Sequence, residues 1–132
     1  MRQRMADARV GRLATITTAG APHIVPCCFV LDNETAYSAV DGKPKSTRAL
    51  RRLENIRNNP RATLLVDFYD EDWNALWWVR VDANARVLDA AADALESGRA
   101  VSLLRAKYDQ YRLDPPAGPV IALDITQWRG WP

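Results

Sequence analysis

The chain has 132 residues, of which 48% are apolar and 26% are charged, and its net charge is +2. This composition is typical of a soluble globular protein, and no apolar run approaches the ~20 residues of a membrane-spanning helix. The length excludes a large second domain, so we expect one domain over residues 1–132. The first residues lead into no apolar core of a signal peptide, which favours the cytoplasm.

Three strands are predicted in the first third of the sequence. The side chains of Leu13–Thr17 are short, branched and uncharged. The turn Thr18–Ala21 separates this segment from Pro22–Leu31, which is rich in valine, isoleucine and phenylalanine. This pattern is typical of two antiparallel strands. A second turn at Asp32–Glu34 leads to a third strand, Thr35–Val40, so the three strands should form a meander.

The segment from Lys43 to Arg61 carries most of the positive charge. It holds seven cations against the single acid Glu54, a local charge of +6 in a chain whose total is +2. The cations are Lys43, Lys45, Arg48, Arg51, Arg52, Arg57 and Arg61. Such concentration indicates an anionic partner. A nucleic-acid surface would have aromatic residues between the cations, and this segment has none, so we expect no nucleic-acid partner.

A helix is predicted within this basic segment. Ser46 or Thr47 can cap its start, and apolar residues recur at helical spacing up to Asn58–Pro60, which ends it. Free backbone N–H groups at a helix start attract anions, and the residues before it add ammonium and hydroxyl groups. The sequence therefore predicts a phosphate site for a small cofactor at this point.

The second half of the sequence alternates between strand and helix patterns. Ala62–Phe68 is an almost continuous apolar run, Trp73–Leu88 is a long strand, and Val120–Trp128 closes the chain with alternating residues. An alanine-rich helix is predicted from about Ala90 to Tyr108. Six strands with short connections and two helices indicate a mainly β protein with α additions, built as a small antiparallel barrel.

No side-chain set for hydrolytic or metal chemistry stands out. His23 is the only histidine, and the adjacent Cys27 and Cys28 would point to opposite faces of a strand, so neither a catalytic triad nor a zinc site is predicted. Hydride transfer needs no protein nucleophile, since a cofactor carries the chemistry. Trp77 and Trp78 on the long strand favour core packing or a subunit interface.

With these elements the chain resembles the pyridoxamine 5′-phosphate oxidase-like split β-barrel flavoproteins. The resemblance rests on Gly11–Thr15, Gly20–Pro26, Tyr37–Lys45 and Asn55–Val66. The loop Asp41-Gly42-Lys43-Pro44-Lys45 and the segment Trp73–Arg80 are most similar to the small members that use the deazaflavin coenzyme F420. The additional arginine-rich motifs of the members that oxidise vitamin B6 are absent here.

The resemblance implies a six-stranded split barrel that forms a homodimer with flavin sites at the subunit interface. It implies transfer of a hydride from reduced F420 to an unsaturated or quinone-like small molecule. The alternative is an FMN-dependent oxidoreductase, or a split-barrel protein that binds a flavin or haem without turnover. Carried onto this sequence, the cofactor contacts are Lys43, Pro44, Lys45, Ser46, Thr47 and Arg48 around the phosphate, Val25, Pro26, Cys27, Ser38, Ala39 and Val40 along the ring, and Trp77 at the interface.

Overall fold

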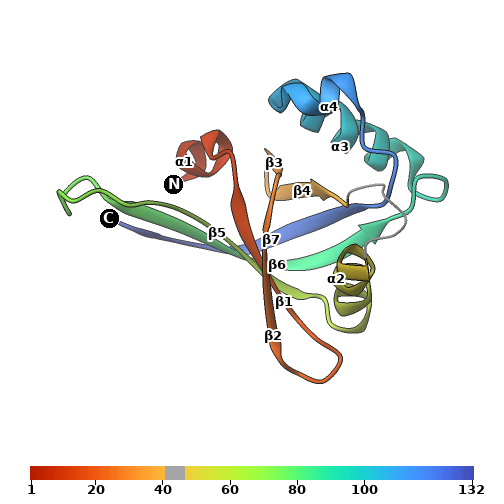
Figure 1. Cartoon of the computed structure of the whole chain (residues 1–132), viewed down its shortest axis with the longest axis horizontal. Helices are drawn as coiled ribbons and strands as arrows, with labels where there is room; N and C mark the ends of the chain where they lie inside the picture. The colour runs from red at the N-terminus through yellow and green to blue at the C-terminus, as the bar shows by residue number, and fades with distance from the viewer. Residues whose placement is uncertain (41–46) are drawn as a thin grey trace.

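The computed structural model describes the backbone of residues 1–40 and 47–132 and the side chains of 1–40 and 51–132 (Figure 1). This part of the chain forms a seven-stranded antiparallel sheet that curls into a half-barrel, accompanied by four helices. The strands are β1 (Gly11–Ile16), β2 (Pro22–Cys27), β3 (Val30–Asp32), β4 (Thr35–Ala39), β5 (Arg61–Phe68), β6 (Trp77–Leu88) and β7 (Val120–Trp131). The helices are α1 (Arg2–Asp7), α2 (Thr47–Asn58), α3 (Ala94–Lys107) and α4 (Asp109–Leu113).

The predicted strand Pro22–Leu31 is wrong, because the chain breaks it into β2 and β3. The strand order is β2-β1-β5-β6-β7-β4-β3, so these two successive strands lie at opposite edges of the sheet. Cys28 and Phe29 carry the chain from one edge to the other, and we call this pair the crossing. The break explains why the sheet has seven strands where six were expected.

Hydrogen bonds from the C-terminal end of α3 hold the crossing, and the Phe29 side chain packs into the core. Phe29 is fully buried, and its backbone N–H bonds to the hydroxyl of Tyr108 at 3.0 Å while its carbonyl accepts from Lys107 Nζ at 2.8 Å. The ring lies against Gly11, where an added Cβ would stand 2.7 Å from Leu64 Cδ1 and 3.1 Å from the Phe29 ring. The absence of a side chain at Gly11 therefore makes room for the crossing.

The core lies on the inner face of the curled sheet. In β5 and β6 the residues alternate between buried and partly exposed, and the buried set includes Leu64, Val66, Val79 and Val81. Helix α2 packs on this face through Leu53 and Ile56. The buried Asn55 donates from Nδ2 to Thr15 Oγ1 at 3.3 Å, which ties α2 to β1. The prediction of this helix, from its start at Thr47 to its end at Asn58, is confirmed.

Other element boundaries differ from the predicted ones. Strand β6 begins at Trp77, because Trp73 lies in the preceding turn and is 70% exposed. Helix α3 begins at Ala94 rather than Ala90, because the Asp89 carboxylate accepts hydrogen bonds from two backbone N–H groups of the turn that precedes it. Strand β7 continues beyond Trp128 to Trp131.

Helix α1 was not predicted. It buries Met5 completely, and Arg2 forms an ion pair with Glu34 and lies over the Trp128 ring at 4.8 Å. Arg4 lies over the Trp77 ring at 5.1 Å. A six-residue helix has little stability of its own, so it depends on these tertiary contacts.

A cluster of charged groups fixes α3 against the sheet. Arg86 donates two hydrogen bonds to Glu96, both at 2.9 Å, and two to Asp124 at 2.6 and 3.0 Å. The Tyr37 hydroxyl also bonds to Glu96 at 2.8 Å. Arg86 lowers the pKa of Glu96, whereas burial and the neighbouring Glu96 raise the pKa of Tyr37 to about 12. Helix α3 is thereby set in place with its C-terminal end at the crossing.

Candidate cofactor site

Two of the predicted ring-lining segments meet beside the crossing. Ser38 Oγ on β4 donates to the carbonyl of Cys28 at 2.7 Å, which joins β4 to the end of β2. Cys27, Ser38 and Val40 are all at least nine-tenths buried. Cys27 and Val40 belong to the same apolar cluster, and Val25 packs against its edge. We call Val25, Cys27, Ser38 and Val40 the inner wall.

The alternation of strand side chains separates the other two predicted ring-lining residues from this wall. Pro26 is exposed, as are its neighbours on the outer side of β2. Ala39 is buried against Leu104 and Tyr108 on the α3 side of β4. Four of the six predicted residues therefore share one wall, and two face elsewhere.

The predicted phosphate residues lie only partly within the described chain. Lys43, Pro44, Lys45 and Ser46 lie outside the described residues, and of Thr47 and Arg48 only the backbone is described. Thr47 is the first residue of α2, so the free N–H groups of this twelve-residue helix follow directly in sequence after Asp41–Ser46, which we call the basic loop. Leu53 and Ile56 of the same helix belong to the apolar cluster that contains Cys27 and Val40, so α2 packs beside the inner wall.

Arg52 differs in burial from the other cations of α2 whose side chains are described. Arg51 and Arg57 are exposed, but Arg52 is only partly exposed, and its Nε is buried with no hydrogen-bond partner in the part of the chain that is described. Its positive charge acts on the Cys27 thiol. A buried guanidinium nitrogen without a partner is unfavourable, and such groups in native proteins call for an explanation. Sequence patterns alone do not distinguish Arg52 from its neighbours.

The inner wall itself is apolar and neutral. Burial raises the pKa of the Cys27 thiol, and this effect exceeds the lowering by the Ser38 hydrogen bond and by the charge of Arg52. Cys27 therefore remains a thiol at neutral pH. An apolar wall beside a cationic group with a free donor fits a flat ring that carries an anionic substituent.

The end of α3 adds two polar side chains that sequence reasoning did not assign to the site. The Lys107 ammonium lies 4.1 Å from the centre of the Phe29 ring and donates to the Phe29 carbonyl. Burial, reinforced by the charge of Arg9, lowers the pKa of Lys107 to about 8. Tyr108 lies at the same point, and burial raises its pKa to about 12. Both residues are about 80 positions from the crossing, so no local pattern could reveal the contact.

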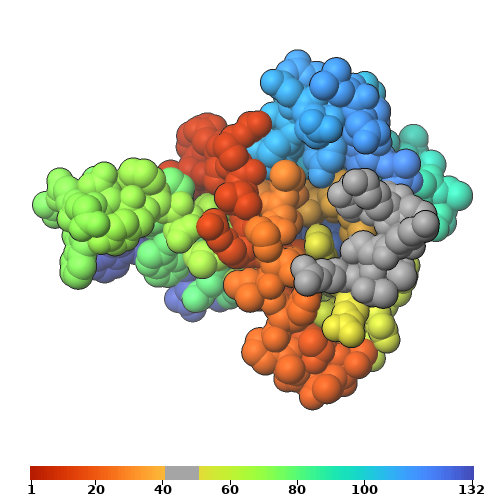
Figure 2. Space-filling view, in the orientation of Figure 1, coloured from red at the N-terminus to blue at the C-terminus, as the bar shows by residue number. Residues whose placement is uncertain are grey.

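Trp77 lies apart from the Ser38–Val40 segment within one chain. Ser38 pairs with Ile121, and Ile121 with Val87, but Trp77 is ten residues from Val87 along β6, which is roughly 30 Å of strand. Trp77 stacks on Phe68 at the hairpin of β5 and β6, which projects from the rest of the molecule in Figure 2.

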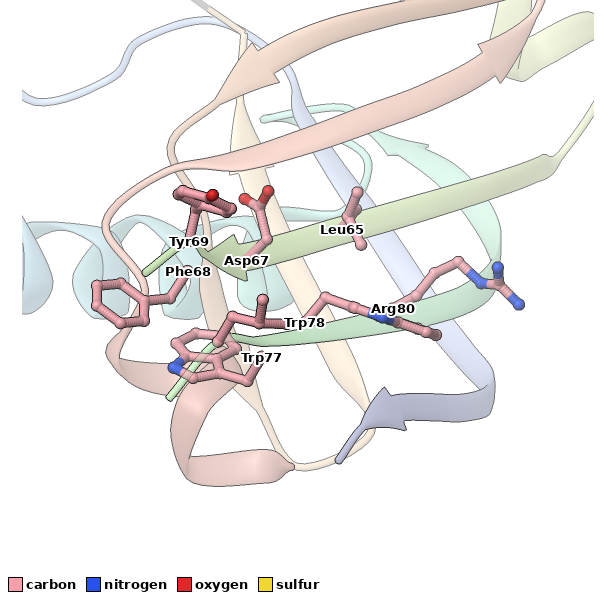
Figure 3. Close-up of a pocket in the computed structure, with 8 residues that line it drawn as sticks. Leu65, Asp67, Phe68, Tyr69, Trp77, Trp78 and Arg80 are labelled. Atoms are coloured by element: carbon pink, nitrogen blue, oxygen red, sulfur yellow. The ribbon is translucent and has the colours of Figure 1, made fainter. Parts of the chain in front are cut away.

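That hairpin carries an apolar groove of about 420 Å³, drawn in Figure 3. Its lining combines aromatic rings with two charged side chains. The lining residues are Leu65, Asp67, Phe68, Tyr69, Leu76, Trp77, Trp78 and Arg80. The groove contains no residue of the inner wall, although Trp77 also packs against the apolar cluster to which Cys27 and Val40 belong.

Neither a membrane-spanning helix nor a metal-binding cluster is present in the described residues. No helix in residues 1–40 or 47–132 is both long and apolar enough to cross a bilayer. Within the same residues, no three histidine, cysteine, aspartate or glutamate side chains are grouped so that they could hold a metal ion.

Comparison with known proteins gives a match over the whole chain. The family model described as pyridoxamine 5′-phosphate oxidase matches residues 1–132. A 5a,11a-dehydrotetracycline/5a,11a-dehydrooxytetracycline reductase of Streptomyces rimosus is 35% identical over 57 residues, which is 43% of this chain and 39% of that reductase. The chain thus matches well under half the length of this relative.

Solved structures share the fold at low identity. An FAD-binding protein from Mesorhizobium loti has a TM-score of 0.72 at 22% identity, with 98% of this chain and 89% of that chain covered. A structure described as an F420 reductase has a TM-score of 0.69 at 20% identity, with 97% and 94% covered. At these identities the likeness establishes the fold.

Proposed function

Because the chain belongs to the pyridoxamine 5′-phosphate oxidase family, we propose that it is an oxidoreductase that binds F420 and transfers a hydride to an unsaturated or quinone-like small molecule. The observation that carries the proposal is the meeting of the apolar inner wall with Arg52 at the helix that follows the basic loop. Support also comes from the F420 reductase that shares the fold and from the partial likeness to the dehydrotetracycline reductase.

In this proposal the residues of the chain divide into an anion-binding group and a ring-binding group. Lys43 and Lys45 hold the phosphate with the help of the Ser46 and Thr47 hydroxyls and Arg48, since ammonium and hydroxyl groups are the donors that a phosphodiester requires. The inner wall supports one face of the ring and keeps water from it. The bound cofactor supplies the hydride, and the protein supplies orientation and electrostatics.

FMN is the alternative cofactor, because it also combines a phosphate with a tricyclic ring. The FAD-binding protein of the same fold favours keeping this alternative. Oxidation of vitamin B6 is disfavoured by the missing arginine-rich motifs.

We propose further that the protein is a homodimer formed through the outer face of β5, β6 and β7. Paired residues on this face form rows across the strands, such as Leu65, Arg80 and Arg129, and then Asp67, Trp78 and Trp131. Trp131 is 56% exposed. A sheet face with exposed aromatic rings is typical of an interface. A dimer would also place the aromatic groove at a subunit boundary.

The dimer is expected to persist at micromolar concentration. Light scattering on the purified protein should give twice the mass of the chain. Replacing Trp131 with aspartate should shift this equilibrium to monomer, because the change buries a charge at the interface. The exposed Leu113 offers a matched control, since it lies on α4 and not on a strand of the proposed interface, so Leu113→Asp should leave the mass unchanged. A wild-type protein that is monomeric throughout would refute this assembly.

Turnover tests the activity. Reduced F420, mixed with the protein and a quinone such as menadione under anaerobic conditions, should be oxidised in step with quinone reduction. Heat-denatured protein serves as the control for direct reaction. A different result would be that the protein binds the cofactor tightly and yet leaves reduced F420 to be oxidised by quinones and cyclic enones at the uncatalysed rate. That result would contradict a reductase and favour a protein that binds the cofactor without turnover.

A further inference from the structure

The crossing connects β2, which contributes Val25 and Cys27 to the inner wall, to β3, which pairs with the strand that carries Ser38. Cys28 and Phe29 follow directly after Cys27 on β2, and β3 pairs along its length with β4, which carries Ser38. Ser38 Oγ also bonds to the Cys28 carbonyl. A shift of the crossing would therefore move Cys27 and Ser38 relative to each other.

The end of α3 satisfies both backbone groups of Phe29. The Tyr108 hydroxyl accepts from the Phe29 N–H at 3.0 Å and lies 2.9 Å from the Phe29 carbonyl and 3.0 Å from the Arg9 carbonyl. Lys107 Nζ donates to the Phe29 carbonyl at 2.8 Å. These are nonlocal contacts to a buried residue, so their loss would leave buried polar groups unpaired.

Lys107 also brings a positive charge to the wall. The groups that act on its ammonium come from three other segments: Asp7 on α1, Arg9 after it, and Cys27 and Cys28 at the end of β2. Cys27 belongs to the inner wall, and Lys107 favours its ionised form. The ammonium therefore acts electrostatically on the wall without belonging to it.

We propose that Lys107 and Tyr108 are positioning residues of the cofactor site, which fix the crossing, and that the Lys107 ammonium favours an anionic cofactor at the inner wall. The electrostatic part of this inference rests on the proposed cofactor function. The amine has a pKa of about 8, so its charge is largely present at pH 7 and largely lost at pH 9. Affinity for an anionic cofactor should fall over this interval.

The pH dependence is measured by fluorescence titration of F420 or FMN, whichever the protein binds, in a Cys28→Ser background that removes the exposed thiol. Affinity should fall about threefold to fivefold from pH 7 to pH 9, the effect expected of a charge near but not touching the cofactor. Lys107→Met should already bind the cofactor more weakly by this factor at pH 7, and its affinity should not fall further at pH 9. Lys107→Arg should keep its affinity to pH 9.

Arg105→Met is the matched control, because Arg105 is an exposed cation on the same helix. It should keep both the affinity and the pH dependence of the parent. The electrostatic role of Lys107 is overturned if Lys107→Met keeps the parent affinity and the same fall with pH.

A second readout needs no cofactor. In the Cys28→Ser background the buried Cys27 is the sole thiol, and its rate of labelling by 5,5′-dithiobis(2-nitrobenzoate) at pH 8 reports how firmly the crossing is held. Tyr108→Phe and Lys107→Met should label at least fivefold faster, whereas Arg105→Met should match the parent. Thermal unfolding identifies the variants that remain folded. If Tyr108→Phe does not fold, the labelling rates of Lys107→Met and Lys107→Arg are compared instead.

The two readouts separate the two claims. Equal labelling rates in folded variants would overturn the positioning role. Absence of binding to F420 and FMN by the parent protein would instead overturn the cofactor function and with it the electrostatic part. The labelling rates would then still decide whether Lys107 and Tyr108 hold the crossing.

Discussion

Replacing Lys43 and Lys45 together with alanine should weaken cofactor binding by tens of fold or more while leaving the fold intact. A charge-assisted hydrogen bond contributes about 1.5 to 3 kcal/mol, so the loss of two such contacts to one phosphate is expected to have a larger effect than the loss of any single contact. Fluorescence titration at low salt measures the affinity, and circular dichroism with thermal unfolding measures the fold.

The matched control removes two other cations of the same basic segment. Arg57 and Arg61 are both exposed, and Arg57→Ala with Arg61→Ala lowers the net charge by the same amount. This double variant should lose only the small, salt-sensitive part of the affinity that long-range attraction supplies. If the two double variants lose affinity equally, the phosphate is not held by the loop lysines, and the segment acts only through its overall charge.

Arg52→Met should weaken cofactor binding by about tenfold to a hundredfold, the range expected for one charge-assisted hydrogen bond. Its Nε is buried and has no partner among the described residues, so we expect that donor to bind an anionic group of the cofactor. Methionine keeps the apolar stem but removes the guanidinium, so the loss should appear in affinity rather than in folding.

Stability distinguishes a binding role for Arg52 from a structural one. If the unpartnered guanidinium is costly in the free protein, Arg52→Met should unfold at an unchanged or slightly higher temperature. Arg57→Met, on the exposed last turn of the same helix, should change neither affinity nor stability. A clear loss of stability in Arg52→Met, with unchanged affinity in the folded fraction, would show that Arg52 serves the fold.

Local patterns predicted most elements of this fold. Capping residues and apolar spacing predicted α2 with its cap at Ser46 or Thr47 and its end at Asn58–Pro60, and the helix spans Thr47–Asn58. The apolar run Ala62–Phe68 predicted β5, which ends at Phe68. The family resemblance, drawn from four stretches between Gly11 and Val66, is confirmed by the match over residues 1–132. These signals are carried by neighbouring residues, which is why sequence reasoning could use them.

The crossing could not be predicted because nothing local marks it. Cys28 and Phe29 are themselves neither glycine nor proline, and Pro26 lies inside β2 rather than at the break. At the break, Tyr108 and Lys107 supply the hydrogen bonds that a neighbouring strand would have supplied. Helix α1 was missed for a related reason, since its stability comes from burial of Met5 and from contacts of Arg2 with Glu34 and Trp128.

The candidate site was predictable in part. The alternation of side chains along a strand indicates which of Val25, Pro26 and Cys27 share a face, but it does not indicate which face is covered by the rest of the protein. Arg52 could not be separated from Arg51 and Arg57, because the difference lies in the burial of a single nitrogen atom. Core packing or a subunit interface was expected for Trp77 because it is a tryptophan on a long strand, and its groove on the β5–β6 hairpin keeps that prediction open to test.

Binding of F420 and of FMN to the cofactor-stripped protein, measured side by side by fluorescence quenching over a range of salt concentrations, tests the central claim most directly. The proposed function predicts tight binding of F420 that weakens with salt, and much weaker binding of FMN. Preference for FMN would replace the deazaflavin with a flavin in the same site. Failure to bind either one would contradict the cofactor function and leave the basic loop with a different anionic partner.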